Sequence, residues 1–346
     1  MIKIGHRSIG NEAPCFVIAE AGVNHNGDIK LAFQLIDVAA AAGADAIKFQ
    51  TFTAANLVTQ KAGMADYQKA NTGLDQSQYE MLKVLELSQD DFAELKIYAE
   101  EKDLVFISTP FDDDAVTLLE NIGVELYKVG SGDLTNLPLI SKLAALQKPI
   151  ILSTGMANME EIHEAVSAVT AYGTEPIVLH CTSNYPTSDD EVNLSAMNQI
   201  KRQTNCIVGY SDHTISIDIP ALAVASGAKV IEKHITLDKA MAGPDHKASI
   251  EPLELESLIT KIRWVEKIMG DGAKTPTRSE SLTALVARKS LVAGKAIKKG
   301  EVLTAGHLAI KRPGSGLKPK YYQDFIGKKA TRDIGTEEIL TWEDIQ

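Results

Sequence analysis

The chain has 346 residues, of which 45% are apolar and 23% charged, and its net charge is -11 at pH 7. This length suits one large domain of about 250 residues beside a small module, with a composition typical of soluble globular proteins. The acidic balance argues against nonspecific nucleic-acid binding, because that activity requires a basic surface.

Short apolar runs rich in β-branched residues predict buried β-strands along the first two thirds of the chain. The runs are 15–22, 46–52, 105–111, 126–133, 149–156, 176–183, 206–212 and 230–238. Segments with a period near 3.6 residues separate them, such as 29–43 and 159–173, and predict helices. Eight strands that alternate with helices are typical of an α/β (β/α)8 TIM barrel. The alternative is an open doubly wound sheet, whose GxGxxG turn AEAGVNHNG does not match.

The interval 53–89 is long for a connection between a strand and the next helix. Long connections at the C-terminal end of a barrel usually shape the active site. A helical insertion that packs at an interface is an equally good explanation of this segment.

The barrel pattern ends near residue 270, so we assign 1–270 to the barrel domain. A linker rich in Gly, Thr, Ser and Pro is expected at 271–285, and a small β-rich module at 286–346. The module has 12 Lys and Arg against 7 Asp and Glu. It is expected either to cover a shared ligand or simply to have a different solvated surface.

Almost every predicted strand ends in polar residues, and barrel active sites are built from strand ends. In chain order these are Glu20 and Asn24, Lys48 and Gln50, Ser108 and Thr109, Lys128 with Ser131 and Asp133, Ser153, His180 with Ser183 and Tyr185, Ser211 with His213, and Glu232 with His234. Any one of them is readily explained as a satisfied polar residue at a strand–loop junction. The complete set, with two lysines in buried patterns, predicts an active site that binds an anion.

The residue types suggest a chemistry for this site. Lys48 and Lys128, with Ser131, Ser153 and Ser211, are suited to bind a phosphate and a carboxylate. A Schiff base on Lys128 is the alternative mechanism, but the serines and the second lysine favour binding of a dianion.

Two histidines are predicted on adjacent strands. His213 and His234 can direct their imidazoles at one divalent ion, although two histidines alone are a weak metal signal. Glu20 and Asp133 are placed to complete the shell through water or to transfer protons.

We expect a cytoplasmic protein without a membrane segment. Cys15, Cys181 and Cys206 lie in apolar runs, which fits a reducing compartment better than a disulfide framework. The start, MIKIGHRSIG, lacks the apolar core of a signal peptide, and no run approaches the ~18 apolar residues needed to cross a membrane.

Ten motifs follow one another along the chain: AEAGVNHNGD, IKFQTF, FISTPFD, YKVGSGDLTNLPLI, ILSTGM, LHCTSNYPT, GYSDHT, IEKHITLD, GPDHKASI and KRPGSG. In this order they resemble the sialic acid synthase family over nearly the whole chain. The C-terminal module looks like the antifreeze-like (SAF) domain of those enzymes. The resemblance implies condensation of phosphoenolpyruvate with N-acetylmannosamine and water to N-acetylneuraminate and phosphate, with Mn2+ or Mg2+ as cofactor.

The motif match also implies roles for individual residues. Phosphoenolpyruvate would be held by Lys48, Thr109, Lys128, Ser131, Ser153 and Ser211. The metal would be held by His213 and His234, with Glu20 and Asp133 as the catalytic residues. The amino sugar would be bound by Gln50, Tyr185, Asp245 and Arg312. Arg312 would come from the partner subunit of a domain-swapped homodimer.

Two positions depart from the family pattern. Asp133 stands where many members have Glu, and Ser183 where some have Asn, so no role is carried over to Ser183. Relatives that make legionaminic acid share these motifs, so a legionaminate synthase using a 2,4-diacetamido-trideoxyhexose is the alternative. The GSGD motif points away from the pseudaminate relatives. A non-catalytic sugar-binding protein is disfavoured, because the set of polar strand ends is complete.

Overall fold

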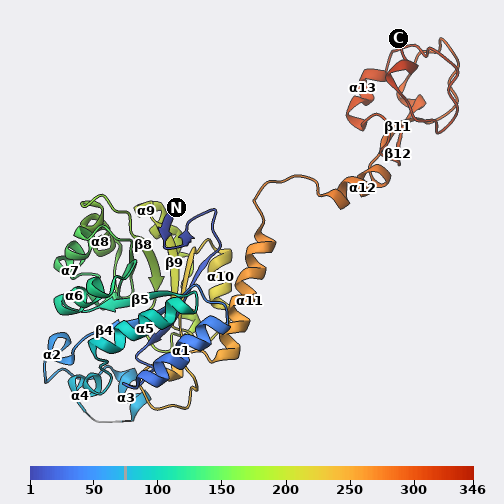
Figure 1. Ribbon diagram of the computed structural model, residues 1–346. Coiled ribbons are helices and arrows are strands. Elements are labelled where there is room, and N and C mark those ends of the chain that lie inside the picture. Colours follow the sequence, from blue (N-terminus) through green and yellow to red (C-terminus); the bar gives the residue numbers. More distant parts are fainter. Residues whose placement is uncertain (74–75) are drawn as a thin grey trace. The chain divides into compact units, whose positions relative to one another are not determined.

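The structure is a computed structural model that describes residues 1–73 and 76–346 (Figure 1). The chain divides into two compact units, Met1–Gly270 and Asp271–Gln346. Across the described ranges, no helix is both long and apolar enough to cross a membrane.

A parallel sheet of eight strands forms the centre of the first unit, within the described residues. The strands are β3 (Phe16–Gly22), β4 (Ala46–Thr51), β5 (Val105–Pro110), β6 (Tyr127–Val129), β7 (Ile150–Ser153), β8 (Ile177–Cys181), β9 (Ile207–Asp212) and β10 (Val230–His234). Their order is β5-β4-β3-β10-β9-β8-β7-β6, and β5 and β6 at its two ends lie side by side. The sheet therefore curls into a barrel, which confirms the predicted (β/α)8 fold.

Each predicted apolar run contributes one barrel strand, but several strands are shorter than predicted, above all those from the runs 126–133, 149–156 and 230–238. After Val129 the chain enters a short 3-10 helix, η1 (Ser131–Asp133). The GSGD sequence is therefore a turn beyond the strand end.

Helices surround the barrel and cover the outward-facing side chains of its strands (Figure 1). They are α1 (Ile29–Ala41), α5 (Gln89–Glu101), α6 (Asp113–Ile122), α7 (Leu137–Ala145), α8 (Met159–Thr170), α9 (Ala196–Thr204), α10 (Ile219–Ala225) and α11 (Pro252–Met269). Helix α8 begins where the Asn158 side chain accepts hydrogen bonds from the next helical N–H groups. It buries Ile162, Ala165, Val166 and Val169, the spacing of one helix face.

The inside of the barrel has an apolar layer at its N-terminal end. Its residues include Phe16, Ile18, Ala46, Val105, Ile107, Leu126, Ile151 and Val230. The hairpin of β1 (Ile2–Ile4) and β2 (Arg7–Ile9) adds Ile4 and Ile9 to this layer. Side chains two residues apart face the same side of a strand. The residues two positions after this layer therefore also face the inside of the barrel, nearer its C-terminal end.

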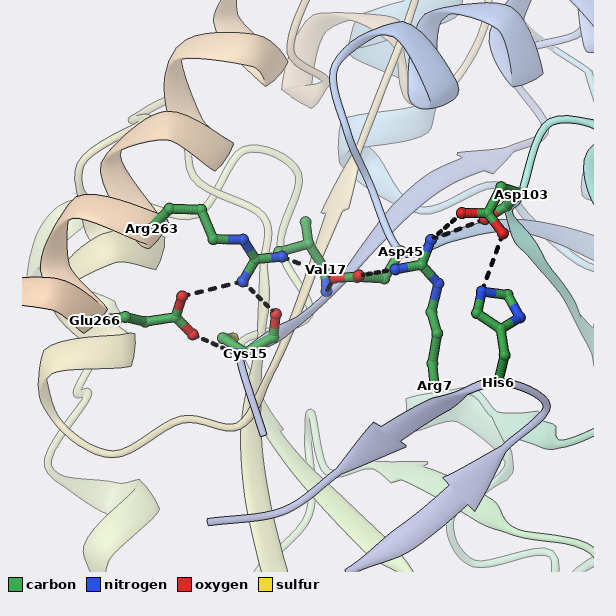
Figure 2. A network of polar contacts seen from close by, with 8 residues as sticks. All are labelled: His6, Arg7, Cys15, Val17, Asp45, Asp103, Arg263 and Glu266. Carbon is green, nitrogen blue, oxygen red and sulfur yellow. Dashed lines mark hydrogen bonds and ion pairs between the residues drawn. The ribbon is translucent and has the colours of Figure 1, made fainter. Parts of the chain in front are cut away.

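A polar network joins the hairpin to the barrel at its N-terminal end (Figure 2). Arg7 donates to Asp45 Oδ1 at 2.6 Å and to the Asp103 carbonyl at 2.8 Å. Asp45 Oδ2 accepts from Val17 N at 2.8 Å and from Arg263 at 3.0 Å. The network therefore links the hairpin to strand β3 and helix α11.

The connection 53–89 is a helical insertion at one end of the barrel, away from the N-terminus (Figure 1). It contains α2 (Ala54–Leu57), α3 (Asp66–Thr72) and α4 (Gln78–Lys83). The Asn71 side chain donates to the Pro244 carbonyl at 2.7 Å, which ties α3 to the loop after β10. The insertion therefore begins after β4 in the sequence and contacts the loop that follows β10.

The second unit has an apolar core of its own, which includes Leu291, Ile297, Leu303, Phe325 and Leu340. Its elements are α12 (Arg278–Ala287), the antiparallel pair β11 (Ser290–Ala293) and β12 (Leu308–Lys311), and α13 (Tyr322–Phe325). Helix α12 begins inside the segment expected to be a linker, after a Thr277 cap that accepts from Glu280 N at 3.2 Å.

Candidate active site

A cavity of about 470 Å³ lies at the C-terminal end of the barrel, between the strand ends and the insertion. The predicted site residues that line it are Glu20, Lys48, Gln50, Thr109, Lys128, Ser131, Ser153, Tyr185, Ser211, His213 and His234. The structure therefore brings together side chains from β3, β4, β5, β6, β7, β9 and β10.

Two lysines and two glutamates are buried together on the floor of the cavity. Lys48 Nζ lies 2.8 Å from Glu20 Oε2 and 3.8 Å from Glu232 Oε2. Lys128 Nζ lies 3.5 Å from Glu232 Oε1. Their opposite charges offset part of the desolvation cost of burial. The floor thus pairs two ammonium groups with two carboxyl groups and holds two cations for an anion that enters.

The pKa values of the two glutamates are pushed in opposite directions. Burial raises the pKa of Glu20 to about 7, although Lys48 opposes this shift. Burial also acts to raise the pKa of Glu232, but Lys128 and Lys48 outweigh it and hold that pKa at about 2. Glu232 is therefore a fixed counter-ion, whereas Glu20 is suited to take up and release a proton near neutral pH.

Each lysine also donates to a hydroxyl group in the cavity wall. Lys48 Nζ donates to Thr109 Oγ1 at 3.2 Å, and Lys128 Nζ donates to Ser153 Oγ at 2.7 Å. Ser211 Oγ donates to Glu232 Oε1 at 2.9 Å. Ammonium and hydroxyl groups that converge in this way are suited to a phosphate or a carboxylate.

Ser131 is held in the turn η1 by the strand-end loop beside it. Its Oγ accepts from Gly155 N at 3.0 Å and lies 3.1 Å from Cys181 Sγ. A Cβ atom on Gly155 would lie 2.1 Å from Ser183 Oγ and 2.9 Å from Ser131 Oγ. Glycine at this position therefore lets the backbone come close to both serine side chains.

His213 and His234 present neutral imidazoles to the cavity. His213 Nδ1 lies 2.7 Å from the Thr182 carbonyl, which places the proton on Nδ1 and leaves Nε2, 3.4 Å from Ser211 Oγ, with a lone pair directed at the cavity. His234 Nδ1 is buried without a hydrogen-bond partner in the described part of the chain. Burial lowers the pKa of His213 to about 4 and that of His234 well below its ordinary value.

These residues fit a divalent metal ion, although they supply only part of its shell. The two ring centroids lie 5.7 Å apart. Gly22 has a φ of 54°, and a Cβ atom there would lie 3.2 Å from Glu20 Oε1 and 3.3 Å from His234 Cε1. Glu20 and His234 therefore border one small space. Within residues 1–73 and 76–346, no cluster of three or more His, Cys, Asp or Glu forms a complete metal site. The donor set suits an ion that takes its other ligands from substrate and water.

Tyr185 forms an aromatic group at the side of the cavity. Its ring centroid lies 4.1 Å from that of His213 and 5.1 Å from that of Tyr67 in the insertion. Gln50 Nε2 donates to Glu20 Oε1 at 3.3 Å. Asp245 is buried in the loop after β10, and this burial raises its pKa to about 6.

Asp133 and Arg312, like Asp245, are not among the residues that line the cavity. The Asp133 carboxylate accepts from Asn136 Nδ2 at 3.1 Å within the turn after β6, and burial raises its pKa. Arg312 is an exposed residue of the second unit, and its peptide bond to Pro313 is cis. The roles of both residues remain predictions.

The sequence did not assign a role to Glu232, although it named this residue as a strand end. The signal was available, because two lysines in buried strands require anionic partners. His180, named in the same way, points out of the barrel, where its Nε2 lies 2.9 Å from the Val192 carbonyl. The sequence also did not predict that Tyr67 of the insertion would contact Tyr185.

Comparisons with known proteins agree with this geometry. The model described as NeuB family matches residues 35–274, and the SAF domain model matches 288–346. The N,N'-diacetyllegionaminic acid synthase of Campylobacter jejuni is 50% identical over 327 residues, 94% of this chain and 98% of that protein. The synthase of the same name from Legionella pneumophila is 41% identical, over 99% of this chain and 98% of that protein. The crystal structure of an N-acetylneuraminic acid (sialic acid) synthetase from Leptospira borgpetersenii, in complex with citrate, matches with a TM-score of 0.73. It is 39% identical, over 82% of this chain and 94% of that chain.

Proposed function

This chain belongs to the NeuB family of phosphoenolpyruvate-dependent condensing enzymes, and we propose that it makes N,N'-diacetyllegionaminic acid from phosphoenolpyruvate and 2,4-diacetamido-2,4,6-trideoxymannose. Formation of a C–C bond between phosphoenolpyruvate and an amino sugar is the activity of the family. Two legionaminic acid synthases, 50% and 41% identical, support the choice of sugar. N-acetylneuraminate, the product expected first from the sequence, is the second candidate. The sialic acid synthetase structure, 39% identical, favours it.

The buried pair of lysines is the observation that carries the proposal. Lys48 and Lys128 lie under the cavity with hydroxyl groups of Thr109, Ser153 and Ser211 beside them. Phosphoenolpyruvate carries its phosphate ester and its carboxylate on the same carbon, and two anionic groups this close together match two cations with shared hydroxyl donors. Fixed cations of this kind also stabilise charge that builds up on the phosphate as it leaves.

Carbon 3 of phosphoenolpyruvate attacks the aldehyde carbon of the open-chain sugar, and carbon 2 becomes electron-deficient. Glu20 accepts a proton from the water that adds to carbon 2, for which its pKa of about 7 is well suited. The C–O bond to phosphate then breaks as the hydroxyl on carbon 2 loses its proton, and carbon 2 becomes the ketone of the product. The two protons of the added water end on the aldehyde oxygen, which becomes a hydroxyl group, and on the released phosphate. His213 and His234 would hold a divalent ion, Mn2+ or Mg2+, which would supply a Lewis acid. The cavity holds the two reactants next to each other.

On the sugar side, Gln50, Tyr185 and Asp245 bind the amino sugar, and Asp133 assists near the attacking water. We also propose a cytoplasmic, domain-swapped homodimer in which Arg312 binds the sugar held by the partner subunit. The support is the SAF domain match at 288–346 and the exposure of Arg312 in the second unit.

Phosphate release from phosphoenolpyruvate, measured with Mn2+ and each of the two sugars, tests the proposal. A higher kcat/KM with 2,4-diacetamido-2,4,6-trideoxymannose than with N-acetylmannosamine is expected. The reverse order would replace the product by N-acetylneuraminate and leave the mechanism in place. No release with either sugar would contradict the catalytic assignment.

A further inference from the structure

The cavity is lined by apolar as well as polar side chains, and four of the apolar ones form a surface that we call the wall. The wall consists of Leu57 and Val58 at the end of α2, Leu82 in α4, and Phe111 after β5. Leu57, Val58 and Phe111 are partly exposed, although each is apolar and lines the cavity. These side chains have no polar group for a phosphate or carboxylate, so they serve another part of the ligands.

The wall is supported from behind by its own small core. Leu82 is buried with Phe52, Met64, Met81 and Leu85, and Leu57, Val58 and Phe111 pack against this cluster. The rings of Phe52 and Phe111 meet edge to face with centroids 6.1 Å apart. At the start of α2, Ala54 N donates to Glu86 Oε1 at 2.7 Å. The wall is therefore a supported surface with a defined shape.

The wall and the two histidines stand on different sides of the cavity. Leu57, Val58 and Phe111 follow β4 and β5, whereas His213 and His234 follow β9 and β10. Strand β3 lies between them in the sheet, and its Glu20 is bonded to Gln50 of β4. Gln50 therefore lies between the histidines and the wall.

We propose that Leu57, Val58, Leu82 and Phe111 select a sugar that carries methyl groups at the end distant from its aldehyde. This inference rests on the proposed function; it places the aldehyde beside the histidines, and it assigns the wall to the methyl of the C4 acetamido group and to the C6 methyl group of the diacetamido sugar. N-acetylmannosamine has hydroxyl groups at C4 and C6 instead. An apolar surface desolvates those hydroxyls without offering a hydrogen bond, whereas it gains contact with methyl groups. The wall therefore discriminates between the two sugars at the end that does not react.

The test uses the full-length protein and near-isosteric polar substitutions in the wall. Val58→Thr and Leu57→Asn keep the size of each side chain and add a polar group. Phosphate release with Mn2+ gives kcat/KM for each sugar, and the quantity compared is the ratio of the two values. Each substitution is expected to lower the preference for the diacetamido sugar by about tenfold, the effect of one methyl group in an apolar pocket. Val84→Thr, at an exposed position outside the cavity, is the matched control.

The outcomes separate the wall from the proposed function. A wild-type preference for the diacetamido sugar that falls in both wall variants but not in Val84→Thr supports the inference. The same wild-type preference with unchanged ratios in the wall variants overturns the wall assignment alone. A wild-type preference for N-acetylmannosamine overturns both the proposed product and the wall assignment. A misfolded variant loses activity with both sugars equally, so its ratio of kcat/KM values stays unchanged while its far-UV circular dichroism spectrum differs from that of the wild type. If a wall variant misfolds, Phe111→Tyr replaces it in the same comparison.

Discussion

A buried ion pair behind the two histidines provides a direct test of how the site is held in place. Lys233 and Asp212 have no solvent exposure, and Lys233 Nζ lies 2.5 Å from Asp212 Oδ2. Lys233 also donates to the Thr214 carbonyl. Asp212 accepts from Thr214 N and from Thr214 Oγ1, both at 3.1 Å. These bonds enclose the turn that carries His213, and Lys233 directly precedes His234.

We expect Lys233→Met to destabilise the barrel by about 3–5 kcal/mol, because it leaves the Asp212 carboxylate buried without its cation. The double variant Lys233→Met with Asp212→Asn removes the charge as well. It should recover at least ~1 kcal/mol of this loss, because an amide is less costly to bury than an unpaired carboxylate. Displacement of His213 and His234 should also weaken Mn2+ binding in the single variant.

The free energy of unfolding is measured by urea denaturation, followed by far-UV circular dichroism, to which the barrel helices contribute most. Lys239→Met is the control, because Lys239 and Glu254 form an ion pair at 2.6 Å in which both side chains are about one third exposed. That change should cost less than about 1 kcal/mol. If Lys233→Met costs no more than the control, or if the double variant is as unstable as the single one, the reasoning is refuted.

Three further predictions concern Lys128 in the cavity, Asp245 in the loop after β10, and the exchange of Arg312 between subunits. Lys128→Met should lower kcat/KM for phosphoenolpyruvate by about 10²-fold or more, whereas Lys142→Met, at an exposed ion pair with Asp113, should leave it unchanged. Equal effects would remove Lys128 from the anion site. Burial raises the pKa of Asp245 from 3.8 to about 6, so this carboxyl should lower the free energy of unfolding by on the order of 3 kcal/mol as the pH rises from 4 through 6. Asp245→Asn should make the measured decrease smaller by that amount, and equal pH profiles in urea denaturation would contradict the assignment. A mixture of inactive Arg312→Ala and inactive Lys128→Met proteins should regain about a quarter of wild-type activity after subunit exchange, since one site in each mixed dimer is complete. No recovery would place Arg312 in the site of its own chain.

Much of the site was predictable because strand side chains alternate. Ile18, Ala46 and Leu126 belong to the apolar layer inside the barrel, and two residues later come Glu20, Lys48 and Lys128. Once a strand and its end are recognised, the residue two positions after an inward-facing one must also face the inside of the barrel. The same alternation explains His180, which follows the inward-facing Leu179 and therefore points outward. The sequence pattern showed the strand but not which of its faces was inside.

Other features depended on contacts between distant parts of the chain. Glu232 pairs with Lys48 and Lys128, which lie on strands from the other half of the barrel sequence. The carboxylate of Asp133 faces Asn136, because the chain leaves the strand after Val129 and turns. No local pattern reveals such pairings, since they depend on how the sheet closes and on where each loop travels.

The sequence by itself determined the eight barrel strands, the polar residues at their ends, the small β-rich module and the family, because strand periodicity and ordered motifs are local properties. Only the tertiary structure decided that Glu232 pairs with both lysines, that Lys233 and Asp212 support the histidine turn from behind, and that the insertion adds apolar side chains to the lining of the same cavity. These features arise when a closed barrel brings distant strand ends within a few ångströms of one another, where burial makes each charge depend on its partner.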